Sequence, residues 1–250
     1  MENKWFLIGV FVFAWNMSIS AQEFSGITGL LNTPTAETDS AGTFRGGMLF
    51  LNHHITPANV LCDGEKYNTG SYFFGVSAWN WLEMSIAFTL KKMHKNYRTE
   101  ERIGYYNQDR RMNIKFRPIK EGEWWPSLAI GAEDLEHFFE KWTKNGGETH
   151  FHNYYGVATK HISIGSSELG VHLGYRYYVS DTNKNRRGFF GGLSFRPAFI
   201  HNLRLMADWD GACLNGGADL LLWRHLYIQL GLTNGKYFVG GLAYHYTIPH

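Results

Sequence analysis

This sequence lacks any apolar run long enough for a membrane helix. A spanning helix needs roughly 20 consecutive apolar residues. The apolar stretch near the start covers only residues 5–14, and no later segment is both long and apolar. The mean hydropathy of the chain is −0.30. We therefore expect no membrane helix in this sequence.

A surplus of one charge and a large cysteine content are also missing. The 24 Lys and Arg residues nearly balance the 22 Asp and Glu residues, so the net charge is +2. This balance argues against nucleic acid as a partner. The two cysteines are Cys62 and Cys213. Neither follows the N-terminal apolar stretch closely, so a lipid-modified N-terminus is not indicated.

The N-terminus has the features of a secretory signal peptide over residues 1–21. Lys4 gives a positive start, residues 5–14 form a short apolar region, and small and polar residues lead to Ala21. We expect cleavage after Ala21, with cleavage after Ser20 as the alternative. The mature chain then has about 229 residues, a length that one barrel can fill.

Short two-faced segments dominate the rest of the chain. In 81–90, Leu82, Met84, Ile86, Phe88 and Leu90 alternate with Glu83, Ser85, Ala87 and Thr89, which is the period of a strand with two different faces. An irregular segment is expected at 22–42. Strands are expected at 43–53, 69–78, 81–90, 110–117, 124–134, 150–161, 168–179, 187–197, 202–211, 216–223, 226–233 and 236–247.

The connections between these strands alternate between short and long. Tight inner turns and longer outer loops are typical of an outer-membrane barrel. The fold class predicted is therefore all-β, a transmembrane antiparallel β-barrel of about 12 strands over 43–250, with 22–42 as a periplasmic or plug segment. The expected outer loops are 54–68, 91–109, 135–149, 180–186, 211–215 and 234–235.

A soluble β-sandwich is the alternative, but aromatic residues at the strand ends fit lipid and its aromatic girdles better. The last strand adds support, because Gly241, Tyr244 and Tyr246 resemble the C-terminal signal read by the outer-membrane assembly machinery. The chain departs from that signal by continuing to His250 rather than ending on an aromatic residue.

Charged side chains must face the lumen, because charge on the lipid face costs several kcal/mol near the bilayer midplane. Two interpretations of this charge remain open: a cross-braced interior of ion pairs, which we favour, and a polar conduit for a hydrated ligand. Asp208 and Asp210 share a face and are expected to pair with Arg204. The predicted lumen network is Arg111, Lys115, Arg117, Lys160, Arg176, Arg196, Arg204, Glu83, Glu133, Glu168, Asp208, Asp210 and Asp219.

No catalytic, metal or cofactor site is predicted. His150 and His152 share a strand face, but a metal site needs three or four convergent ligands. No Gly-x-Ser-x-Gly segment occurs, and Ser166 and Ser167 fall in an inner turn. Both cysteines fall on the outer side, where a disulfide between them is left open because the sequence gives no distance.

One segment carries a family resemblance. Residues 26–36, which include Gly26, Gly29, Leu30, Pro34, Thr35 and Ala36, resemble the opening of the YjbH-like family of exopolysaccharide-associated outer-membrane proteins. Weaker matches are residues 126–134 with 154–160, and 207–211 with 215–217. The resemblance implies a barrel in exopolysaccharide or capsule export or envelope assembly, without enzyme activity or cofactor. It implies outer-membrane lipid, exopolysaccharide and periplasmic assembly proteins as partners.

Two other functions stay open. One is a barrel enzyme acting on lipid or glycan at the outer rim, which a Ser/His/acid trio would favour. The other is a structural or adhesive barrel that binds through its loops. Within 26–36, we expect Leu30, Pro34 and Ala36 to pack the segment into the inner mouth of the barrel.

Overall fold

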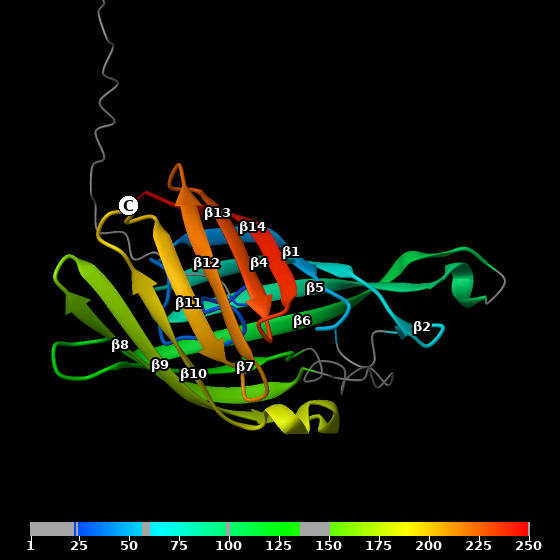
Figure 1. Ribbon diagram of the computed structural model, residues 1–250, viewed down its shortest axis with the longest axis horizontal. Coiled ribbons are helices and arrows are strands. Elements are labelled where there is room, and N and C mark those ends of the chain that lie inside the picture. The colour runs from blue at the N-terminus through cyan, green and yellow to red at the C-terminus, as the bar shows by residue number, and fades with distance from the viewer. Residues whose placement is uncertain (1–22, 24, 57–60, 99–100, 136–150, 250) are drawn as a thin grey trace, which may run out of the picture.

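In a computed structural model of the protein, antiparallel strands form a closed barrel (Figure 1). The structure describes residues 23, 25–56, 61–98, 101–135 and 151–249. Within these residues twelve strands make up the barrel, and the predicted fold class is confirmed. The first and last barrel strands pair with each other and close it. No helix among the described residues is long and apolar enough to cross a membrane.

Each barrel strand pairs with its neighbours along the chain. The barrel strands are β1 (Thr43–Leu51), β4 (Thr69–Trp79), β5 (Leu82–His94), β6 (Ile103–Ile119), β7 (Ser127–Glu133), β8 (Asn153–Ile164), β9 (Ser167–Tyr178), β10 (Gly188–Arg196), β11 (Leu203–Trp209), β12 (Leu214–Leu222), β13 (Leu226–Thr233) and β14 (Tyr237–Thr247). A separate hairpin consists of β2 (Leu61–Cys62) and β3 (Glu65–Lys66), and two 3-10 turns are η1 (Lys95–Tyr97) and η2 (Asp181–Arg186).

The two faces of the strands differ as the alternation predicts. Along β5, Glu83, Ser85 and Ala87 are buried toward the lumen, whereas Ile86 is exposed on the outside. Along β9 the pattern repeats, with Arg176 buried and its neighbours along the strand exposed. An apolar exterior around a polar interior is the arrangement that lipid requires of a barrel.

Aromatic residues gather where the strands meet the inner turns. Trp79 and Trp81 flank the β4–β5 turn and stack with ring centroids 5.2 Å apart. Trp124, in the β6–β7 turn, is also exposed. Such girdles lie at the level of the lipid headgroups, so these turns lie near one membrane surface.

The structure corrects the prediction for two outer connections. Residues 91–94 and 103–109, expected in a loop, continue β5 and β6 as a two-stranded ribbon beyond the barrel (Figure 1). The β2–β3 hairpin occupies part of the expected loop 54–68. Outside the lipid no apolar face is needed, so the ribbon pairs through its backbone without the alternation that identifies a strand in sequence.

Strand ends differ from the prediction by a few residues elsewhere. The β6–β7 connection is longer than expected, since β7 starts at Ser127, and β8 continues to Ile164. The predicted signal peptide, most of the loop 135–149 and His150 lie outside the described residues. Their predictions stay as they are.

Leu173 provides a test of the lipid-facing exterior. It lies midway along β9 and its side chain is 60% exposed on the outer face. We expect Leu173→Arg to reduce the free energy of folding into lipid vesicles by about 2–4 kcal/mol, because the charge lies near the bilayer midplane. Urea titration of the refolded protein measures this.

Phe199→Arg is the matched control. Phe199 is 83% exposed but lies in the β10–β11 turn at the membrane surface, where an arginine costs about 1 kcal/mol or less. Equal losses for the two variants would contradict the placement of β9 in lipid.

Candidate functional site

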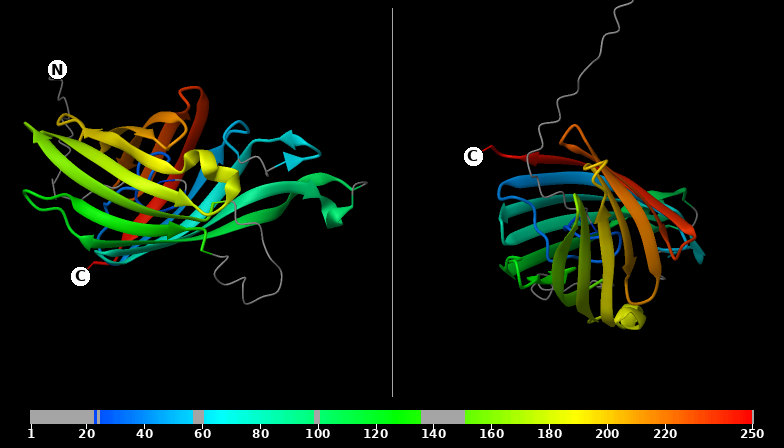
Figure 2. Two further views of the ribbon diagram at one scale, coloured as in Figure 1. Left: turned by 90° about the horizontal axis from the view of Figure 1, so that it is seen from below. Right: turned by 60° about the vertical axis from the view of Figure 1, so that its left-hand side comes forward.

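The lumen is filled by the chain's own N-terminal segment, residues 25–39, which we call the plug. It is coloured blue inside the barrel in Figure 2. Ile27, Leu30 and Ala36 are completely buried, and Leu31 is almost completely so. The predicted plug segment thus lies deeper than the inner mouth, where its packing was expected.

Local chemistry folds the plug into a tight hairpin. Gly29 and Pro34 form an antiparallel bridge, and the Leu30 amide donates to the Thr33 carbonyl at 2.8 Å. A side chain on Gly29 would place its Cβ only 2.6 Å from the Thr33 oxygen. The close approach of the two arms therefore requires glycine at this position.

The tip of the hairpin carries two leucines into a cradle of small wall residues. Leu30 and Leu31 pack with Met206 of β11 and Val239 of β14. A Cβ on the luminal Gly231 of β13 would lie 2.8 Å from the Leu31 side chain. The wall is thus shaped to accept the tip, because packing this close leaves no room for larger wall residues.

Glu83 of β5 holds the plug from the wall. Its Oε2 accepts from the Thr28 amide at 3.2 Å and the Thr28 hydroxyl at 2.8 Å, and its Oε1 accepts from the Asp39 amide at 2.9 Å. Lys115 of β6 lies 3.0 Å from the same carboxylate and also donates to the Thr28 carbonyl at 2.9 Å. Arg45 of β1 is 3.4 Å away.

The plug and the wall are complementary in charge. Glu37 and Asp39 are acidic, and residues 25–39 include no Lys or Arg. Glu37 lies 3.4 Å from Arg204, and Asp39 lies 3.2 Å from Arg45. Glu23, which precedes the plug, pairs with Arg176 at 3.1 Å. Three carboxylates are therefore each set against a wall arginine.

The surroundings shift the pKa values of these plug carboxyls in opposite directions. Burial acts to raise the pKa of Glu37, but the His161 ring and the charges of Arg204 and Arg196 hold that pKa well below its usual range. Burial raises the pKa of Asp39 to about 6, against the opposing charge of Arg45. Glu37 is therefore the firmly ionised member, which fits its position among three basic side chains.

The tip of the plug is held by Asp208 rather than by a network around Arg204. Asp208 accepts from the Asn32 amide at 2.8 Å and from the Asn215 side chain at 2.7 Å. The predicted pairing of Asp208 and Asp210 with Arg204 is wrong. Arg204 pairs at 3.0 Å with Asp219, its direct cross-strand neighbour, because opposite residues on paired strands are closer than residues further along one strand.

Other residues of the predicted network are placed around this centre. Asp210 leaves the network, because it orders the outer β11–β12 turn and pairs with Arg186 at 3.2 Å. Arg117 lies half-buried at the inner end, where it donates to the Asn80 carbonyl. Residues that face the lumen as predicted are Glu83, Arg111, Lys115, Glu133, Glu168, Arg176, Arg196, Arg204, Asp208 and Asp219.

The predicted luminal position of Lys160 is wrong. The inward residues of β8 are Tyr155, Val157 and Thr159, so Lys160 starts on the opposite face. It is at the inner end of the strand, where its ammonium donates to the Gly122 carbonyl at 2.6 Å and lies 3.1 Å from Glu121. A long side chain near the membrane surface can reach polar groups in this way.

Cys62 and Cys213 are both free thiols, so the disulfide that the sequence left open is absent. Cys62 lies on the β2–β3 hairpin, between β1 and β4, whereas Cys213 precedes β12. In the barrel order β13 and β14 stand between β12 and β1. The two thiols therefore lie at different parts of the outer rim.

One row of hydrogen-bonded side chains includes a serine and a histidine, as a hydrolase site does, but its surroundings are not those of an active site. The His172 ring lies 3.1 Å from the Ser194 hydroxyl and 2.9 Å from the Thr159 hydroxyl. All three are buried in the lumen, and the Ala36 amide of the plug donates to Thr159. A threonine stands where a triad has an acid, and the plug covers the group.

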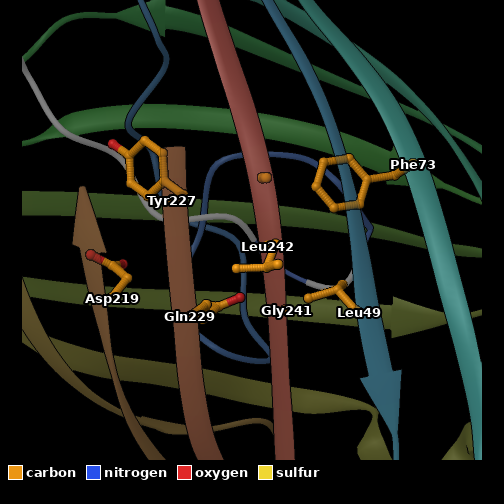
Figure 3. Close-up of a pocket in the computed structure, with 8 residues that line it drawn as sticks. Leu49, Phe73, Asp219, Tyr227, Gln229, Gly241 and Leu242 are labelled. Carbon is orange, nitrogen blue, oxygen red and sulfur yellow. The ribbon is translucent and has the colours of Figure 1, made fainter. Parts of the chain in front are cut away.

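A small, mostly apolar cavity lies among wall residues of the barrel (Figure 3). Its volume is about 10 Å³, which is the room of one water molecule. Leu49 and Phe73 line one side, and Tyr227, Gln229 and Asp219 line the other. A cavity of this size does not conduct a solute.

Several plug contacts could not be identified from the sequence. Arg45 is the exception: it lies at an inward position of β1, and the alternation of that strand could have identified it as a luminal residue. Glu37, Asp39 and Asn32 lie in an irregular segment, where no periodicity points to a partner. Their contacts depend on which wall strand the hairpin meets.

Glu83→Gln tests the wall contact that holds the plug. We expect a loss of about 3–5 kcal/mol in the free energy of unfolding, because Arg45 and Lys115 lose their buried counter-charge. Denaturant titration of the refolded protein in detergent measures the loss. Glu168→Gln is the control, since that carboxylate also pairs with an arginine, Arg196, but is 41% exposed. Its loss should stay below about 1 kcal/mol, and similar losses would count against a special role for Glu83.

Glu37→Gln is expected to have an effect that depends on pH. Because the folded-state pKa of Glu37 is depressed, its contribution is present above the unfolded pKa and disappears as pH falls through the folded pKa. The variant should lose on the order of 2 kcal/mol near neutral pH, and the gap to wild type should shrink on acidification. Thermal unfolding of both proteins, from neutral pH down to acidic pH, tests this prediction. A difference in stability that does not change with pH would refute it.

Comparison with known proteins supports the resemblance seen in the sequence. The family model described as "Exopolysaccharide biosynthesis protein YbjH" matches residues 21–215. A curated relative, "Uncharacterized lipoprotein YjbH" of Escherichia coli (strain K12), is 29% identical over 157 residues, which are 62% of this chain and 19% of the relative. The match thus spans about a fifth of that relative's length.

Two solved structures are similar in outline. Outer membrane phospholipase A of Escherichia coli is 10% identical, with a TM-score of 0.31, over 83% of this chain and 96% of that one. OprB of Pseudomonas putida, in a low-pH structure, is 11% identical, with a TM-score of 0.28, over 82% and 91%. Scores this low carry no argument about function. The family match covers well over half of the chain, and the protein therefore belongs to the YjbH family of exopolysaccharide biosynthesis proteins.

Proposed function

We propose that this chain is a non-enzymatic outer-membrane barrel that serves exopolysaccharide or capsule export, with its own plug closing the lumen at rest. The observation that carries the proposal is the placement of residues 25–39 in the lumen, between Glu83, Lys115 and Asp208 of the wall. The family supports the pathway, and the plug supports a lumen that can be closed and opened.

The wall is built to tolerate departure of the plug. Glu83 pairs with Lys115 and Arg45, and Arg204 pairs with Asp219, all within the wall. These pairs remain when the plug leaves, so the charges of these five wall residues are not left isolated in the emptied lumen. A polar lumen of paired charges and small residues suits a hydrated sugar polymer.

After the plug, the chain passes out of the lumen at the inner end of the barrel, which is the end that a periplasmic partner would reach. The Thr38 hydroxyl donates to the Asn80 carbonyl at 2.6 Å, and the Ala41 amide donates to the Asn80 side chain at 2.7 Å. Asn80 is in the inner β4–β5 turn. A periplasmic protein that binds the chain at this position can withdraw the hairpin through the inner end of the barrel. We expect the signal peptide at 1–21 to direct the chain to this compartment.

The hydrolase alternative has less support. Ser194 and His172 face the lumen, away from lipid, and their neighbour Thr159 already accepts from the plug. A lipid substrate would have to enter a filled barrel to reach them. We therefore propose a role without catalysis.

Single-channel recording tests the proposal. The refolded mature chain in a planar bilayer should show little or no conductance, because the buried plug residues occupy the lumen. Deletion of residues 22–42 should produce stable open channels, and a synthetic peptide of that sequence added from the periplasmic side should close them again. This block by the peptide separates a gated lumen from a damaged barrel.

Absence of conductance in both forms would refute the conduit, provided that both run as folded barrels on unheated gels. The structural or adhesive alternative would then account for the family role through the outer loops. Leu31→Ala, which loosens the tip without shortening the chain, gives an independent check. It should produce brief openings at a frequency between those of the full and deleted forms.

A further inference from the structure

Three ligand-type side chains converge on the outer side of the barrel, outside the plugged lumen. The Cys62 thiol, the Asp63 carboxylate and the His94 imidazole place one ligand atom each within 4.8 Å of one another. Cys62 ends β2, Asp63 opens the turn to β3, and His94 ends β5 on the ribbon. The group therefore joins two outer elements that are separate in the chain.

The local backbone positions the first two ligands. Cys62 pairs with Glu65 across a two-residue turn of Asp63 and Gly64, both with positive φ. Asp and Gly are the residues that such a turn favours. The turn alone explains why Asp63 is an aspartate, but it does not explain a thiol and an imidazole beside it.

The His94 ring is oriented as a metal ligand is. Its Nδ1 lies 3.1 Å from the Glu101 backbone carbonyl, and its Nε2 lies 2.9 Å from Asp63. Donation of the Nδ1 proton to a carbonyl fixes the tautomer and directs the Nε2 lone pair at the metal position. The nearby Lys92 ammonium lies over the rings of Tyr67 and Tyr105, at 5.3 and 5.4 Å.

We propose that Cys62, Asp63 and His94 bind a zinc ion. Zinc takes thiolate, imidazole and carboxylate ligands at about 2.0–2.3 Å, so ligand atoms on one tetrahedral ion lie roughly 3.3–3.8 Å apart. The three ligand atoms lie within 4.8 Å of one another and the His94 Nε2 to Asp63 Oδ1 pair at 2.9 Å, so zinc binding widens this pair and brings the Cys62 Sγ into the same range. As zinc binds, the Cys62 thiol gives its proton to solvent. The fourth position faces solvent, and the ion fastens the β2–β3 hairpin to the ribbon.

Zinc titration of the refolded chain in detergent, in competition with a chromogenic chelator, tests the site. Wild type should bind one equivalent, and Cys62→Ser and His94→Gln should each bind at least 10-fold more weakly. Cys213→Ser removes the other free thiol, and His53→Gln removes another outer-loop histidine, so both should match wild type. Cobalt in place of zinc should give thiolate charge-transfer absorption that Cys62→Ser abolishes.

Alkylation of Cys62 gives a second readout that does not depend on affinity. In a Cys213→Ser background, zinc should slow alkylation of Cys62 at least 10-fold, and His94→Gln should remove the protection. If Cys62→Ser binds zinc as wild type does, or if no saturable equivalent is found, the proposal is overturned. The three residues would then be a turn and an Asp63–His94 ion pair only.

Discussion

The closed lumen depends on the carboxylate of Glu83. A chain segment inside a barrel must satisfy its backbone amides and carbonyls there, because bulk water does not reach them. Glu83 does this by accepting from Thr28 and Asp39, while Lys115 donates to the carbonyl of the same Thr28. Glu83 and Lys115 together satisfy the donors and the carbonyl of Thr28, and the two opposite charges balance each other. A neutral wall could not hold this segment as closely without leaving polar groups unpaired.

The same interactions set how the plug can leave. The wall pairs are shared within the wall, whereas Glu37, Asp39 and Glu23 each face an arginine across the plug boundary. Withdrawal therefore separates three acidic groups from three arginines but keeps the wall's own pairs together. Under the proposed function, these contacts keep the lumen closed at rest.

The parts of the structure that lipid governs could be predicted from the sequence, and the parts that it does not govern could not. Lipid on one face imposes the alternation seen along β5 and β9, so the strands and the luminal positions of Glu83 and Arg176 follow from the order of residues. The ribbon beyond the membrane has no such constraint, so the sequence predicts a loop there. The predicted luminal position of Lys160 is wrong because polar side chains at the membrane surface can lie on either face. The partners of Asn32 and Glu37 could not be predicted from the sequence, because an irregular segment has no periodicity that points to a wall strand.

The shape of the wall argues that the plug belongs to the resting fold. Gly231 and Gly192 stand at luminal positions, and a Cβ at either would lie within 2.8 Å of a side-chain atom of Leu31 or Leu30. Glycine in a strand weakens the strand, and the room that Gly231 leaves is taken up by Leu31, whereas at Gly192 the Ala207 carbonyl of the next strand also excludes a Cβ. A wall that carries this cost and packs closely around two leucines is complementary to the hairpin. If the lumen conducts as proposed, opening it therefore requires work to separate the hairpin from this wall.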